Sequence, residues 1–212
     1  LLDAYRQPPP QTDHPAEGGK YPAQLVWQQK NNGAIVMKVS DGVFKQGAKT
    51  DHKEVELSVD DRGALFEALL DAANEPNFKS KQIVVRKHQF VFQPGGGRMS
   101  ENPVTQVTLT ITRDDNGCIS LGYSKGDYKQ MFRFKGPNST VVIVRNEQGE
   151  KVEDHGLMSR WMVRHWVSFH KPILERMELD GWEPPKPRGD ANGNGGNGGN
   201  GYNNNGGGRS EP

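Results

Sequence analysis

The chain has 212 residues, with 27 Lys and Arg against 26 Asp and Glu, giving a formal net charge of +1, and it has one cysteine. That charge alone indicates no partner, and a single cysteine excludes a disulfide framework and a cysteine-based zinc site. No run of 18 apolar residues is present, so no membrane-spanning helix is predicted. The lone Cys118 fits a reducing compartment, and a buried hydrophobe is favoured for it over a reactive thiol.

Both terminal segments are poor in residues that could form a core. Residues 1–20 contain four prolines, and 17 of the 20 residues from 189 to 208 are Gly or Asn. Such compositions cannot bury enough surface to offset the entropy of ordering. We therefore expect a flexible N-terminal segment over 1–20, one domain over 21–184 and a disordered Gly/Asn-rich tail over 185–212.

Charge is unevenly distributed along the expected domain. Residues 54–75 carry seven carboxylates and one arginine, whereas residues 79–135 carry ten Lys and Arg against four carboxylates. A localised basic surface is what a polyanion needs for binding. The alternative is that the two segments pair with each other across the fold.

The first half of the domain shows strand patterns and then a helix pattern. Alternating apolar residues predict strands over 23–29 and 34–39, joined by an Asn-Asn-Gly turn. A loop over 41–53 and a short strand over 54–57 follow.

The clearest predicted helix begins at a Ser58 cap and ends at Asn74, before a proline. Its apolar stripe comprises Leu65, Phe66, Leu69, Leu70 and Ala73.

The second half reads as a strand series closed by a long helix. The predicted strands cover 81–92, 104–113, 118–124, 128–135 and 140–145. The predicted helix covers 157–179, and its large apolar residues are expected in the core or at a subunit interface. They are Met158, Met162, Trp166, Phe169, Ile173 and Met177. The fold class expected is α+β, a twisted antiparallel sheet packed by two helices, the C-terminal one long.

No catalytic motif is recognisable. The sequence has no phosphate-binding loop, no dinucleotide fingerprint, no nucleophile elbow and no paired histidines at metal-ligand spacing. His165 and His170 are five residues apart, which is not the spacing of four that metal-binding helices use. We therefore predict a non-enzymatic protein without a metal or a cofactor.

Two predicted strands interleave basic and aromatic residues, the combination that holds single-stranded nucleic acid through phosphates and base stacking. Lys129, Arg133 and Lys135 share one face of the strand over 128–135. The core is favoured for Phe132 and Phe134 on the other face and, less clearly, for Phe90 and Phe92. Stacking and packing stay open for Trp27, Tyr123 and Tyr128. The candidate nucleic-acid-binding residues are Trp27, Lys38, Arg86, Lys87, Phe90, Tyr123, Lys125, Tyr128, Lys129, Arg133 and Lys135.

The order of elements with a basic-aromatic sheet resembles the PC4/Whirly-type single-stranded-DNA binders. More narrowly, residues 123–135, the aromatic helix over 161–169 and the Gly/Asn tail resemble the single-stranded-DNA-binding proteins of N4-like tailed phages, of the Drc type. The resemblance implies a homo-oligomer, roles in phage replication and transcription, recruitment of a polymerase, and the cytoplasm of an infected bacterium. The near-neutral C-terminus departs from the acidic, partner-docking end of many such proteins.

Three functions follow as hypotheses. The first is sequence-tolerant binding of single-stranded DNA. The second is RNA binding or transcription regulation through the same surface. The third is a structural or protein-interaction domain in which the long helix contacts the partner.

Overall fold

The computed structural model describes residues 11–15, 22–40, 52–93, 96–136 and 139–181. The chain divides into two units, Leu1–Trp182 and Glu183–Pro212, and all described residues belong to the first. Its elements in chain order are β1 (Gln11–Pro15), β2 (Pro22–Gln29), β3 (Ile35–Ser40), β4 (His52–Glu56), α1 (Val59–Asn74), β5 (Ser80–Lys87), β6 (Phe90–Gln93), β7 (Gly96–Met99), β8 (Val104–Arg113), β9 (Ile119–Lys125), β10 (Tyr128–Arg133), β11 (Ile143–Arg145), β12 (Lys151–Glu153) and α2 (His155–Asp180). The α+β class predicted from the sequence is confirmed.

Eight strands form one antiparallel sheet in the order β4-β3-β2-β1-β10-β9-β8-β5, and β6–β7 and β11–β12 are separate hairpins. Side chains from the two end strands meet, because Lys87 Nζ on β5 lies 3.2 Å from Glu56 Oε1 on β4. Lys125 Nζ on β9 also donates to the Glu54 carbonyl of β4 at 2.6 Å. The sheet is therefore curled.

The strand β1 corrects the expectation for the N-terminal segment. The sequence predicts a flexible segment over 1–20, yet Gln11 pairs with Arg133 of β10 and with Gln24 of β2. Main-chain pairing needs no apolar side chain, which is why composition does not reveal this strand. The predicted tail over 185–212 and most of the predicted loop over 41–53 lie outside the described residues.

The helix α1 begins and ends where its sequence indicates. Ser58 Oγ accepts from the Asp61 amide at 3.1 Å, and Asp61 Oδ2 accepts from the Ser58 amide at 3.1 Å, a reciprocal capping box. The buried side of α1 includes Leu65, Phe66 and Leu69, as its apolar stripe predicts.

The helix α2 is longer than predicted, and its buried side differs from the predicted stripe. Its buried residues are Gly156, Met158, Ser159, Val163, Trp166, Val167, His170 and Leu174. Phe169 is instead 37% exposed, and Trp161 is 46% exposed. Choosing the largest apolar residues rotates the predicted stripe, because the buried side also uses Val, Ser and His.

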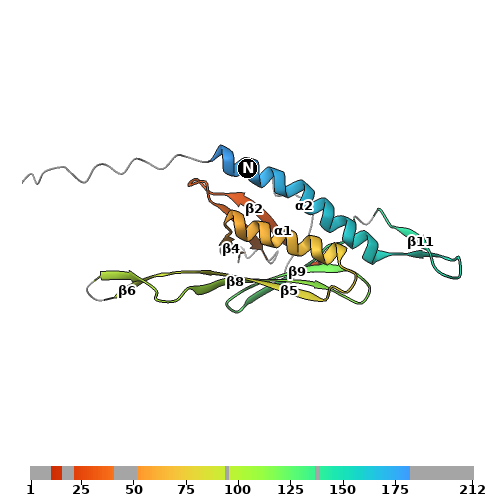
Figure 1. Ribbon diagram of the computed structural model, residues 1–212, viewed down its shortest axis with the longest axis horizontal. Coiled ribbons are helices and arrows are strands. Elements are labelled where there is room, and N and C mark those ends of the chain that lie inside the picture. The colour runs from red at the N-terminus through yellow and green to blue at the C-terminus, as the bar shows by residue number, and fades with distance from the viewer. Residues whose placement is uncertain (1–10, 16–21, 41–51, 94–95, 137–138, 182–212) are drawn as a thin grey trace, which may run out of the picture. The chain divides into compact units, whose positions relative to one another are not determined.

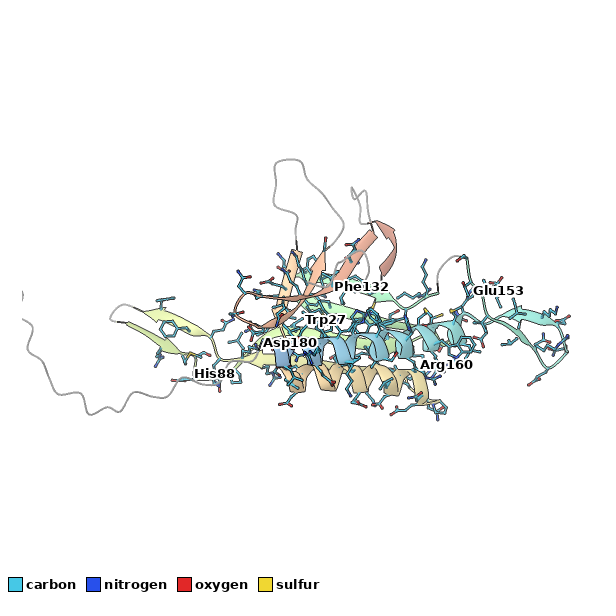
Figure 2. The ribbon with its side chains drawn as sticks, turned by 90° about the horizontal axis from the view of Figure 1, so that it is seen from above. Trp27, His88, Phe132, Glu153, Arg160 and Asp180 are labelled. Carbon is cyan, nitrogen blue, oxygen red and sulfur yellow. The ribbon has the colours of Figure 1, made fainter. Side chains whose placement is uncertain are left out.

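The core joins both helices to the sheet through stacked rings. Trp27 of β2 lies 6.1 Å from the rings of both Phe66 and Trp166, and Phe134 lies 5.7 Å from Trp166. Figure 2 labels Trp27 and Phe132 among the strands and helices at the centre of the unit. Both helices lie on one side of β5, β8 and β9 (Figure 1). In the part of the chain described, no helix is both long and apolar enough to cross a membrane.

Two hairpins depart from the predicted strands. The strand expected over 81–92 is interrupted at His88 and Gln89, and the chain then forms β6 and β7. The glycine-rich stretch expected as a loop over 94–97 contributes its last two residues to β7. The strand expected over 140–145 is shorter, and its partner β12 is not predicted.

Candidate nucleic-acid interface

One face of β5, β8 and β9 is left uncovered by the helices, which lie on the opposite side of the sheet (Figure 1). The strand β10 pairs with β9 and extends this face. Strand alternation places three rows of side chains there, each running from β10 across β9 and β8 to β5. The rows are Lys129, Ser124, Thr108 and Val84; Met131, Gly122, Thr110 and Gln82; and Arg133, Ser120, Thr112 and Ser80. We call these twelve positions the open face. From strand and row spacings it measures roughly 14 Å by 13 Å.

The middle of the open face consists of short side chains. The six positions on β8 and β9 are three threonines, two serines and one glycine, and none of the twelve positions is a carboxylate. A Cβ added at Gly122 would lie 3.3 Å from Met131 Cε and 3.5 Å from Thr110 Cβ, so the Met131 side chain lies over this glycine. Hydroxyl groups both donate and accept, so this floor can bond phosphate oxygens or base edges.

Cationic side chains border the open face on two strands. Lys129 and Arg133 stand on β10 and are exposed. Arg86 is exposed near the end of β5, just past a shift in register between Val85 and Arg86, and so lies beyond the three rows. Arg133 Nη2 lies 3.0 Å from Asp114 Oδ2. Within the described residues, Lys129 and Arg86 make no ion pair or side-chain hydrogen bond. These two cations are therefore available to an anionic ligand.

The acidic residues of α1 lie on the helix side of the sheet and pair with cations there. Asp71 and Glu75 lie 2.7 Å and 3.1 Å from Lys81 Nζ, and these bonds raise the pKa of Lys81. Glu67 lies 3.8 Å from Lys171 Nζ of α2. The acidic and basic segments thus pair at Lys81 and at Lys87, whereas Arg86, Lys129 and Arg133 make no ion pair with α1 in the described part of the chain.

The other predicted basic residues are placed differently. Lys87 and Lys125 bind Glu56 and the Glu54 carbonyl, and so connect the curled sheet instead of standing on the open face. Lys38 is half-buried on β3, three strands from β10 in the sheet order. Lys135 is exposed just beyond the end of β10.

The prediction of base stacking is wrong for two residues. Trp27 is 1% exposed and Tyr123 is 0% exposed, so neither ring can meet a base. Both belong to the core: Trp27 packs against Phe66 and Trp166 of the helices, and Tyr123 meets Tyr128 of β10 edge to face. Burial raises the pKa of Tyr123, and its hydroxyl has no hydrogen-bond partner among the described residues. Phe132 and Phe134 are buried, as their strand face predicts.

The two remaining aromatic candidates differ in exposure. Tyr128 is partly buried, with its ring 6.2 Å from Tyr123 and Lys53 Nζ 5.8 Å from its centroid. Phe90 is 54% exposed on the β6–β7 hairpin, and its neighbour Phe92 is 85% exposed. The favoured core position of these two phenylalanines is wrong, because the hairpin leaves the sheet.

The hydroxyl rows and Met131 were missed as candidate site residues. Their signal is the alternation within 106–112, where Val107, Leu109 and Ile111 are buried and threonines lie between them. Polar residues at alternate positions indicate only a wet face, so the pattern does not distinguish a binding surface from ordinary solvation.

Reactive groups are scarce in the described residues. They contain no cluster of three His, Cys, Asp or Glu that could hold a metal ion. Cys118 is buried, and burial raises the pKa of its thiol. A thiol so placed behaves as a small hydrophobe.

No family model, no curated protein and no solved structure matches this chain. The function must therefore be inferred from the side chains of the open face and from the exposed β6–β7 hairpin.

Proposed function

We propose that the protein binds single-stranded DNA without strong sequence preference, and that the open face contacts the sugar-phosphate backbone. The observation that carries this proposal is the open face itself, a sheet surface floored by hydroxyl groups, bordered by Lys129, Arg133 and Arg86, and free of carboxylates. Cations that neutralise phosphates supply affinity without reading sequence.

The separation of charge supports the same function. The chain carries a net charge of only +1, so a polyanion would be weakly attracted if charges were evenly mixed. Because the acidic side chains of α1 are on the helix side, the open face keeps a positive surface.

The test is fluorescence anisotropy with labelled oligothymidine over a series of salt concentrations. The wild-type affinity should fall steeply with salt, because binding releases counterions from the strand. In the Lys129→Ala/Arg86→Ala variant the affinity should fall several-fold at low salt. The slope of log K against log salt should become shallower by about 0.7 for each phosphate that the variant no longer neutralises.

The matched control is Lys171→Ala, which removes one positive charge from the helix side. It should leave both the affinity and the slope as in the wild type. If the wild type shows no salt-dependent binding, or if the control weakens binding as much as the open-face variant, the proposal is wrong. The same titration with oligouridine measures preference, since only RNA offers the 2′-hydroxyl.

We also propose that copies of the chain associate through the outer side of α2. Trp161 and Phe169 on the outer side of α2 are 46% and 37% exposed, and large exposed rings of this kind mark interfaces. A second copy of the chain could cover them. Sedimentation velocity of the wild type and of the Trp161→Ser/Phe169→Ser variant tests this, with a lower mass expected for the variant.

A further inference from the structure

The β6–β7 hairpin exposes an apolar face that no described element covers. Phe90 pairs with Met99 and Phe92 pairs with Gly97, so both rings and Met99 share one side of the ribbon. Phe92 is 85% exposed, and Phe90 and Met99 are each 54% exposed. The ring centroids of Phe90 and Phe92 are 5.0 Å apart, at an interplanar angle of 77°.

The position of the rings depends on a glycine. A Cβ at Gly97 would lie 2.0 Å from Phe90 Cε1, so the Phe90 ring lies directly against the backbone of β7. The ring of Phe92 is largely exposed to solvent.

The base of the hairpin is held by hydrogen bonds. Ser100 donates its amide to the Gln89 carbonyl at 2.7 Å, its Oγ accepts from the Gln89 amide at 3.0 Å, and its carbonyl lies 2.8 Å from His88 Nδ1. Figure 2 labels His88 at this base. Because a two-stranded ribbon alone is marginally stable and this one exposes two large rings, a ligand that covers the rings would stabilise it.

The charges around the rings indicate the chemistry of that ligand. No carboxylate occurs between residues 80 and 100, and Arg86 stands on β5 just before the hairpin. Arg98 lies within β7 opposite Val91, on the side of the ribbon away from the rings, and 4.0 Å from Glu101. The hairpin also follows directly from β5, one border of the open face. Flat apolar rings with no carboxylate on either strand of their hairpin, in a segment that continues the proposed phosphate-binding surface, suit the bases of the same polynucleotide.

We propose that the β6–β7 hairpin is a stacking arm on which Phe92 and Phe90 hold unpaired bases, and that this arm gives the protein its preference for single strands. The proposal rests on the proposed function, in which the open face holds the phosphates. Phosphates are present in single and double strands alike, whereas the faces of paired bases are occupied by their neighbours in the duplex. The cations therefore set the salt dependence, and the arm sets the discrimination between single strand and duplex.

The test compares oligothymidine with a duplex of the same length, using the Phe90→Ala/Phe92→Ala variant. Its affinity for the single strand should fall at least about tenfold, because stacking on one aromatic side chain contributes about fivefold or more per base and the variant removes two rings. The salt slope and the weak duplex affinity should stay as in the wild type, since no charge is removed.

Two single substitutions separate stacking from simple apolar contact. Phe92→Trp should keep the wild-type affinity, whereas Phe92→Leu, which retains an apolar side chain without a ring, should lose it. Val91→Ala, on the opposite side of the ribbon, is the matched control and should bind as the wild type. The melting temperature of each variant checks that the fold is intact, and no change is expected because these side chains are exposed.

The inference is overturned if the double variant binds the single strand as tightly as the wild type, or if Phe92→Leu does. It is also overturned if the double variant changes only the sedimenting mass, because the hairpin would then be a contact between copies. If Lys129→Ala/Arg86→Ala makes the salt dependence of binding shallower while Phe90→Ala/Phe92→Ala binds as the wild type, the proposed function stands and the stacking arm is contradicted. A wild type that binds no single-stranded DNA removes both.

Discussion

Three buried polar side chains hold the helices in place, and they are satisfied to different degrees. Ser159 Oγ accepts from the Ile119 amide at 2.8 Å and donates to the Phe134 carbonyl at 2.6 Å, so it connects α2 with the sheet. Arg62 donates to the Leu57 carbonyl at 2.7 Å and pairs with Glu178 of α2. His170 has only one partner, because its Nδ1 lies 2.8 Å from the Trp166 carbonyl and its Nε2 has none among the described residues.

His170 makes stability depend on pH. Burial lowers its pKa from 6.5 to about 4, with a further contribution from His165. The unfolded chain therefore takes up the proton first as the pH falls, so the free energy of unfolding should decrease from pH 6.5 down to pH 4. The loss should reach about 3 kcal/mol. Urea denaturation at a series of pH values measures it.

The variant His170→Gln removes the titrating ring and should flatten this dependence. The control is His155→Gln, because the side chain of His155 is 73% exposed beside Glu153. This control should follow the wild-type curve. A His170→Gln curve parallel to the wild type between pH 6.5 and 4 would contradict the assignment.

Among the elements, local sequence decides where α1 begins and which face of each strand is buried. The capping box of Ser58 and Asp61 is readable from sequence because both partners lie within four residues. The alternation of Val107, Leu109 and Ile111 likewise fixes the buried face of β8, because side chains of a strand point to opposite sides. The buried side of α2 is predicted less well from the sequence. Val163, Ser159 and His170 are buried because of the segments that pack on them, and not because their side chains are large and apolar.

The cap of α1 can be tested separately. Ser58→Ala should lower the free energy of unfolding by about 1 kcal/mol, because the Asp61 amide loses its acceptor. Ser58→Gly should cost only a few tenths of a kcal/mol, since water reaches the exposed end of the helix. Chemical denaturation of the two variants measures both, and an unchanged free energy of unfolding in Ser58→Ala would show that the hydroxyl does not contribute as a cap.

For the whole molecule, the consequential feature is the division of charge between the two sides of the sheet. The net charge of +1 hides an acidic helix that binds Lys81 and Lys171 on one side. The open face with Lys129 and Arg133 lies on the other. This division follows from the alternation of side chains along the strands, which puts Lys81 on the side of the helices and Lys129 and Arg133 on the opposite side.

The described residues end at Gly181, just after α2, and the Gly/Asn-rich sequence of the C-terminal segment lacks side chains that could add to the core. A chain truncated after Pro184 should therefore keep the melting temperature of the full chain. Differential scanning calorimetry of the two proteins checks this. A lower melting temperature for the truncated chain would mean that the C-terminal segment packs on the fold.

The sequence by itself determined the α+β class, the cap of α1, the shared face of Lys129 and Arg133, and the bounds of β2, β3, β8, β9 and β10 to within two residues. Each of these depends on residues close together in the chain, through backbone periodicity and local hydrogen bonds. Tertiary structure alone decided that Trp27 and Tyr123 are core, that Phe92 is exposed on a hairpin, and that β1 joins the two halves of the sheet. Those outcomes depend on which distant segments pack together, and periodicity within one strand carries no information about what covers it.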